Sequence, residues 1–183
     1  DIIIQLGAIS AVLFLYWKRL WNRELIKRLL VAFVPTGVIG LALYQTVKTY
    51  FLASEPVVLW ALFLGGVGLI IFEWWHTEPS EASPSLDSIS YRQAFLVGVF
   101  QSVSIIPGVS RAAATIVGGL LVGLKRKTIV EFSFLLAVPT MLAASGLDFV
   151  KNISSFSKDH FEFLVVGFII SFVVAMASIK FLL

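Results

Sequence analysis

A serine and an arginine stand in one of the most apolar stretches of the chain, and their types and spacing could bind an anion. They belong to the segment SIIPGVSRAAATIVGG, residues 104–119. Pro107 and Gly108 are expected to interrupt a helix, because proline lacks an N–H and glycine adopts backbone angles that other residues avoid. Ser110 then stands where the N-cap of a new helix belongs, ahead of alanine-rich sequence. The pattern predicts a second helix with Arg111 in its first turn.

The chemistry that this arrangement predicts is phosphate binding. A helix N-terminus attracts anions, and the planar guanidinium of Arg111 matches phosphate oxygens. Without an anion the placement is unfavourable, since the helix dipole repels a cation there and a charge at membrane depth costs about 3 kcal/mol on insertion scales. Thr115, one turn later, can add a hydroxyl to the same face. We therefore expect a phosphate-bearing ligand that is reached from within the bilayer.

The residues alone leave other roles open. Arg111 could instead pair with carbonyls, or with a carboxylate of another helix, as a purely structural contact. Gln101, taken by itself, is expected to form hydrogen bonds between helices rather than to bind a ligand. No carboxylate is expected at mid-membrane depth, whereas hydrolysis of a phosphate ester usually needs a general acid or base, or a metal held by carboxylates. These residues predict an anion cradle without visible catalytic groups.

The composition of the chain predicts an all-α integral membrane protein. Of its 183 residues, 58% are hydrophobic and 14% are charged, and the mean hydropathy is +0.95. An ordinary soluble domain has about 45–50% apolar and about 25% charged residues. Cysteine is absent from the sequence, which excludes disulfides and thiolate chemistry. The net charge of +3 is small and gives no reason to expect a nucleic acid partner.

Apolar runs divide the chain into two halves around a polar linker. The first half, residues 1–75, is predicted to contain three spans, at residues 2–17, 29–47 and 57–75. Proline, serine and acidic residues crowd the linker, residues 76–92. The second half, residues 93–183, is predicted to contain a helical hairpin at 93–124 and spans at 129–149 and 162–183.

The hairpin follows from charge and length. Basic residues in the predicted loop 18–28 and at 125–127 mark cytoplasmic segments. The stretch 93–124 must therefore cross an even number of times or turn back. As one helix it would measure about 48 Å against a hydrocarbon core of about 30 Å, whereas a break at Pro107-Gly108 gives two legs of about 21 Å. We expect a re-entrant hairpin with its tip toward the extracytoplasmic side, although two short tilted spans satisfy the same charge rule.

Residues 95–142 resemble the second half of undecaprenyl pyrophosphate phosphatases, the bacitracin-resistance type of membrane phosphatase. The family pattern is a glutamine, then Pro-Gly-x-Ser-Arg-Ser-x-x-Thr-Ile, then Phe-Ser-Phe-Leu-Leu-x-x-Pro. The matching residues are Gln101, Pro107, Gly108, Ser110, Arg111, Thr115, Ile116, Phe132, Ser133, Phe134, Leu135, Leu136 and Pro139. The opening residues 2–21 resemble the span that follows the first motif of the family.

The resemblance implies a multi-pass enzyme of the bacterial inner membrane. Such an enzyme removes the terminal phosphate of the C55 isoprenyl pyrophosphate lipid, which recycles the carrier for peptidoglycan synthesis and confers bacitracin resistance. It also implies two inverted repeats and a divalent cation, Mg²⁺ or Ca²⁺, and it leaves open whether the protein forms a homodimer. By the same resemblance, Ser110 and Arg111 are catalytic. The implied substrate-binding residues are Gln101, Gly108, Val109, Ser110, Arg111 and Thr115.

The sequence departs from the family pattern at two places. Ala112 stands where the family usually has serine, which removes one hydroxyl from the phosphate site. The first motif of the family, which carries its acidic residues and a histidine, would lie upstream of Asp1. We therefore expect a fragment of an inverted-repeat protein, truncated at both ends, without metal ligands and inactive alone. The alternatives are a polyprenyl-phosphate transporter or flippase with the same cradle, and a non-catalytic membrane scaffold.

Overall fold

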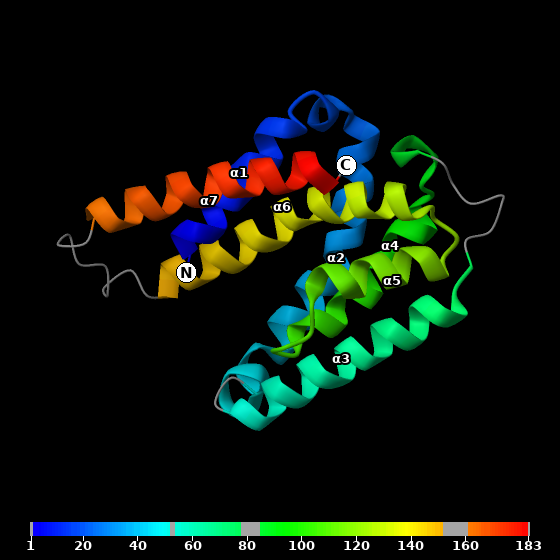
Figure 1. Ribbon diagram of the computed structural model, residues 1–183, viewed down its shortest axis with the longest axis horizontal. Coiled ribbons are helices and arrows are strands. Elements are labelled where there is room, and N and C mark those ends of the chain that lie inside the picture. The colour runs from blue at the N-terminus through cyan, green and yellow to red at the C-terminus, as the bar shows by residue number, and fades with distance from the viewer. Residues whose placement is uncertain (1, 52–53, 78–84, 152–160, 183) are drawn as a thin grey trace. The chain divides into compact units, whose positions relative to one another are not determined.

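The computed structural model describes residues 2–51, 54–77, 85–151 and 161–182, and within these ranges the chain forms helices and no strand. The α-helices are α1 (Ile2–Leu15), α2 (Arg23–Thr46), α3 (Glu55–Trp75), α4 (Tyr91–Gln101), α5 (Arg111–Leu121), α6 (Arg126–Lys151) and α7 (Phe161–Leu182) (Figure 1). Among the described residues, α2, α3, α6 and α7 are long and apolar enough to cross a membrane. The predicted all-α membrane class is confirmed.

The helices begin close to the predicted positions, with one difference at the start of α2. The basic loop expected over 18–28 is shorter, because a 3-10 helix forms at Arg19–Trp21 and α2 begins at Arg23. Asn22 explains this start, since its Oδ1 accepts the N–H groups of Glu24 at 3.0 Å and Leu25 at 3.3 Å. The helix α1 has 14 residues, about 21 Å, so its crossing of a membrane stays a prediction.

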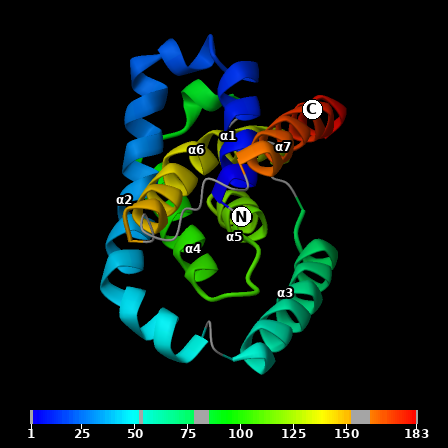
Figure 2. The same ribbon diagram turned by 90° about the vertical axis from the view of Figure 1, so that its left-hand side faces the viewer.

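Two compact units divide the chain, and α2 and α6 each pass from one unit into the other. The first unit contains residues 1–26 and 134–183. In it, α1 packs along α7 (Figure 2). Ser171 Oγ donates to the carbonyl oxygen of Ile4 at 2.5 Å, and Gly7 lies against the backbone of Phe168. An apolar cluster of this unit comprises Ile9, Val12, Val138 and Ile179.

The second unit, residues 27–133, contains most of α2, all of α3, α4 and α5, and the first residues of α6. In both ribbon views α4 and α5 lie side by side. This division by packing does not coincide with the predicted repeat boundary at 76–92. The repeat concerns internal symmetry rather than contacts, so that boundary stays a prediction.

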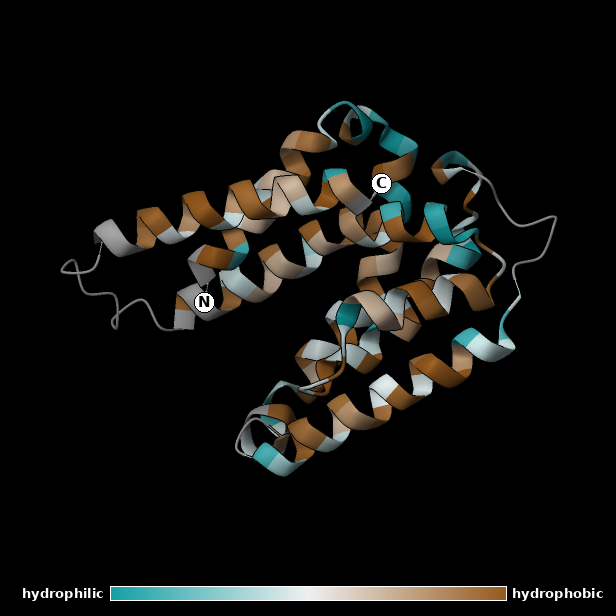
Figure 3. Ribbon diagram, in the orientation of Figure 1, coloured by the Kyte–Doolittle hydropathy of each residue, from teal (hydrophilic) through white to brown (hydrophobic). Residues whose placement is uncertain are grey.

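The helix α3 exposes apolar side chains along most of its length. It is coloured as hydrophobic along most of its length in Figure 3, and none of its residues is buried within the described part of the chain. Its exposed side chains include Trp60, Phe63, Ile70 and Trp74. A surface of this kind is unfavourable in water and favourable in lipid. Together with the four candidate spans, it identifies a membrane protein.

Candidate anion-binding site

The predicted hairpin at 93–124 is present as a pair of short helices. The helix α4 ends at Gln101, a 3-10 helix covers Ser102–Ile105, and α5 begins at Arg111. At the other end, Gln93 Nε2 donates to the carbonyl oxygen of Val122 at 3.0 Å, so the pair returns to the level at which it began. Each α-helix has 11 residues, about 16 Å, which is too short to cross a core of about 30 Å. The re-entrant path through a bilayer stays a prediction.

The tip of the hairpin has the features of a type II turn. The N–H of Val109 donates to the carbonyl oxygen of Ile106 at 3.1 Å, with Pro107 and Gly108 between them. The φ of Gly108 is +95°, which side chains disfavour. A Cβ on Gly108 would also lie 2.5 Å from the carbonyl oxygen of Val58 in α3. Glycine is therefore required at this position both by the turn and by the close approach of α3.

Two further glycines seat the hairpin against its neighbours. A Cβ on Gly98 would overlap the carbonyl group of Ala32, so α4 and α2 approach backbone to backbone. A Cβ on Gly118 would overlap the ring of Phe100, so α5 packs equally closely against α4. Because these contacts involve a backbone and the base of a half-buried aromatic side chain rather than flexible side-chain ends, they place the hairpin firmly within the second unit.

The N-terminus of α5 brings the predicted anion ligands together at this tip. Ser110 is the N-cap, as predicted, and its Oγ accepts the N–H of Ala113 at 3.3 Å. Arg111 is the first residue of the helix and is half-buried, while Ser110 is exposed. Gly108 and Val109, both half-buried, precede them in the turn. A guanidinium, a hydroxyl and helix N–H groups thus occupy one short stretch of backbone.

Gln101 and Thr115 lie deeper and face one another. Gln101 is 1% exposed and Thr115 is 0% exposed. Thr115 Oγ1 lies 3.2 Å from Gln101 Oε1 and 2.8 Å from the carbonyl oxygen of Arg111, so its proton is shared within the protein. Gln101 Nε2 donates to Thr36 Oγ1 of α2 at 3.0 Å. The helix-bridging role predicted for Gln101 from its residue type is confirmed, and contact of either side chain with an anion stays a prediction.

Thr36 of α2 belongs to the same group of hydrogen bonds, although it was not predicted from the sequence. Its hydroxyl also donates to the carbonyl oxygen of Gly98 at 3.1 Å, so it contacts α4 twice. The signal for it was a hydroxyl residue directly after Pro35 in an apolar helix. Polar side chains in such helices commonly form hydrogen bonds to neighbouring helices.

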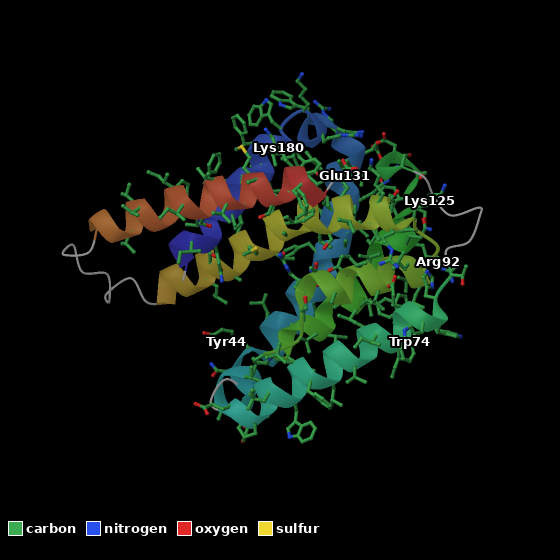
Figure 4. All side chains as sticks on the ribbon, viewed as in Figure 1. Tyr44, Trp74, Arg92, Lys125, Glu131 and Lys180 are labelled. Atoms are coloured by element: carbon green, nitrogen blue, oxygen red, sulfur yellow. The ribbon has the colours of Figure 1, made fainter. Side chains whose placement is uncertain are left out.

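The position of the hairpin tip can be measured along α3. Near the C-terminal end of α3, Glu73 accepts two hydrogen bonds of 2.9 Å from Arg126, the first residue of α6. Arg92 and Lys125 lie at this same open end of the hairpin in Figure 4. The tip contacts Val58, 15 residues earlier along α3, which corresponds to about 22 Å. Since α3 has 21 residues, the tip lies well past its midpoint.

A metal ion does not fit the residues of this site. Within the described ranges, no three histidine, cysteine, aspartate or glutamate side chains come together. The tip itself offers a guanidinium and hydroxyls, of which the first repels a cation. The arrangement can bind an anion and stabilise negative charge on it, and the described residues supply no ligand set for Mg²⁺ or Ca²⁺.

Comparison with known proteins finds sequence matches that extend over the whole chain. The family described as "Bacitracin resistance protein BacA" matches residues 1–183. The chain is 48% identical over 183 residues to an "Undecaprenyl-diphosphatase" of Sulfurihydrogenibium sp. (strain YO3AOP1), which covers 100% of this chain and 72% of the relative. It is 45% identical over 184 residues to the protein of that name from Aquifex aeolicus (strain VF5), again covering 100% and 72%. The helical pair and its arginine-bearing tip lie inside the matched region, and the chain belongs to the BacA family.

Proposed function

We propose that the protein to which this chain belongs hydrolyses undecaprenyl diphosphate to the monophosphate and inorganic phosphate. The observation that carries the proposal is the position of Arg111 in the first turn of α5, at the tip of a helical pair that packs against the apolar helices α2 and α3. Relatives with the name undecaprenyl-diphosphatase match the chain from end to end and support the choice of substrate. By this reaction the protein would recycle the lipid carrier for cell-wall synthesis and confer resistance to bacitracin.

The diphosphate is proposed to bind at the N-terminus of α5. Arg111 would contact the phosphoryl oxygens through its planar guanidinium, and Ser110 would donate its hydroxyl hydrogen while its Oγ still accepts the N–H of Ala113. The backbone of Gly108 and Val109 would line the same oxygens. When water forms a bond to the terminal phosphorus and the bond from that phosphorus to the bridging oxygen breaks, negative charge develops on the bridging oxygen. Arg111 would stabilise that charge more in the transition state than in the bound substrate.

The family resemblance implied that Gln101 and Thr115 bind the substrate, and in this proposal they support the residues that do. Both side chains are closed off from the surface, and their hydrogen-bonding groups are used within the protein. The family resemblance implies a divalent cation, and no step of this proposal depends on it.

The site is proposed to open on the extracytoplasmic side of the bacterial inner membrane. Basic residues gather at the open end of the hairpin, where the guanidinium of Arg28 lies 5.8 Å from the ring centre of Tyr91 and where Arg92 and Lys125 also stand. Positive residues mark the cytoplasmic ends of spans. The tip is about 22 Å away along α3, so it would face the opposite leaflet.

Phosphate release from a polyprenyl diphosphate tests the proposal. The protein, with its native flanking sequence, would be purified in detergent and assayed with Mg²⁺ or Ca²⁺ present. Arg111→Ala is expected to lower kcat/KM by about 100-fold or more, because a charge-stabilising donor is lost. Arg126→Ala is the matched control, since it removes an arginine whose exposed side chain pairs with Glu73 at the open end.

The control separates the possible outcomes. Loss of phosphate release in Arg111→Ala with an active Arg126→Ala would support the proposal. Tight binding of the diphosphate lipid without any release by the wild-type protein would contradict it and would favour a transporter that uses the same cradle. Full activity of Arg111→Ala would also contradict it.

A further inference from the structure

A series of hydrogen bonds, with Gln101 and Thr115 buried and Thr36 half-buried, joins α2, α4 and α5 directly behind the tip of the hairpin. Thr36 Oγ1 accepts from Gln101 Nε2 at 3.0 Å, and Gln101 Oε1 lies 3.2 Å from Thr115 Oγ1. Each helix contributes one side chain, so the three helices are connected through the two ends of a single amide. The amide nitrogen of Gln101 donates to α2, and its amide oxygen accepts from α5.

These hydrogen bonds restrict how the three helices pack, because Gln101 and Thr115 are closed off from water. Gln101 is 1% exposed and Thr115 is 0% exposed, so water cannot replace a lost partner. A buried amide without a partner costs more free energy than the hydrogen bond contributes, which disfavours any arrangement of the helices that breaks the series. The relative position of α2, α4 and α5 is thereby restricted more strongly than by apolar packing alone.

The last link reaches the backbone of the arginine. Thr115 Oγ1 lies 2.8 Å from the carbonyl oxygen of Arg111, one turn earlier in α5. Displacement of Gln101 would therefore change the contact at Thr115 and move the first turn of α5. That turn carries both Ser110 and Arg111, whose positions determine where an anion can bind.

We infer that Thr36 is a positioning residue. It holds Gln101 in the orientation that aligns the first turn of α5, and with it Arg111, with the diphosphate. Thr36 acts through Gln101 and does not contact the substrate. This inference rests on the hydrolysis proposed above and adds a residue of α2 to the determinants of that reaction.

The close contact of α4 with α2 supports this assignment independently. Gly98 lies against the carbonyl group of Ala32, and the hydroxyl of Thr36 donates to the carbonyl oxygen of Gly98 at 3.1 Å. Thr36 therefore contacts α4 both at Gly98 and one turn later at Gln101. Its hydroxyl accepts one hydrogen bond and donates another, which valine, with nearly the same shape, cannot do.

Kinetics of Thr36→Val and Thr36→Ser test the inference. In the purified protein with its native flanking sequence, Thr36→Val is expected to lower kcat for phosphate release by about tenfold while KM changes by less than about threefold, because alignment matters most in the transition state. Thr36→Ser keeps the hydroxyl and is expected to restore kcat to within about threefold of the wild type. Ser102→Ala is the control, since Ser102 Oγ also donates to Gly98 O, at 2.9 Å, and not to the side chain of Gln101.

Each outcome separates this inference from the proposed function. If the wild-type protein is active and Thr36→Val retains its kcat, the positioning role is wrong and the hydrolase proposal stands. If Thr36→Ser loses as much kcat as Thr36→Val, or Ser102→Ala loses as much, the hydrogen bond to Gln101 is not responsible and the inference is overturned. If the wild-type protein releases no phosphate, the proposed function itself fails. A thermal unfolding curve for each variant ensures that kcat refers to folded protein.

Discussion

The same three residues, Val-Pro-Thr, occur in two long apolar helices, and their threonines form different hydrogen bonds. In α2 the tripeptide is residues 34–36, and in α6 it is residues 138–140. Thr36 donates across to the carbonyl oxygen of Gly98 in α4 at 3.1 Å. Thr140 donates to carbonyl oxygens of its own helix, those of Leu136 at 2.8 Å and Ala137 at 3.1 Å. Identical local sequence thus produces a contact between helices in one region and a contact within a helix in the other.

The cause lies in what packs against each helix. In α2 the equivalent intrahelical acceptor would be the carbonyl of Ala32, and Gly98 of α4 is pressed against that group. The missing side chain of Gly98 lets its own carbonyl come within reach of Thr36. Beside Thr140, Val138 belongs to an apolar cluster with Ile9, Val12 and Ile179. The neighbouring surface, rather than the tripeptide, selects the partner of the hydroxyl.

The largest effect in this comparison is expected at the close contact itself. Gly98→Ala should lower the free energy of unfolding by about 3 kcal/mol, because the new Cβ would overlap the carbonyl group of Ala32 and the backbones must separate. Denaturant titration in detergent would measure it. Gly146→Ala in α6 is the control, since nothing lies within 4 Å of its added Cβ. Equal stability of the two variants would show that α4 and α2 do not approach in this way.

A smaller difference is expected between the two threonines. Thr36→Val should destabilise the protein by about 1–2 kcal/mol, because it leaves the buried amide of Gln101 without its acceptor on α2. Thr140→Val removes hydrogen bonds to the carbonyl oxygens of its own helix, a kind that contributes little to stability, and is expected to cost less. The difference between their midpoints in the same titration is the measurement. A greater loss in Thr140→Val would reverse the comparison.

A substitution in the apolar cluster around Val138 is expected to lower stability without changing catalysis. Val138→Ala should cost about 1 kcal/mol, because it removes two methyl groups from the cluster with Ile9, Val12 and Ile179. Neither kcat nor KM for phosphate release should change, in contrast to Thr36→Val. A tenfold fall in kcat at unchanged stability would show that this cluster also aligns the site.

The smallest effect is expected for the exposed ion pair at the open end of the hairpin. Glu73→Gln should change the free energy of unfolding by less than about 1 kcal/mol, because Glu73 is 59% and Arg126 is 45% exposed. The difference between Glu73→Gln and the wild type should shrink further as salt is added. A cost as large as that of Thr36→Val would mean that exposed pairs hold the hairpin as strongly as the buried amide does.

Much of the site could be predicted from residues that act locally. The break at Pro107-Gly108 and the cap at Ser110 follow from missing N–H groups, backbone freedom and a short hydroxyl side chain, none of which needs distant partners. The short legs on either side follow from helix rise against membrane thickness. The start of α2 at Arg23 was predicted too late because the capping role of Asn22 was overlooked among basic residues.

By itself, the sequence determined a helical membrane protein with a hairpin whose tip presents Ser110 and Arg111, because hydropathy, proline and capping residues act on the chain within a few residues. Only the tertiary structure decided that Gln101 and Thr115 are closed off behind that tip and that Thr36, from a different helix, completes their hydrogen bonds. Those contacts depend on how closely glycine lets two backbones approach, a distance between segments more than 60 residues apart that no local pattern encodes.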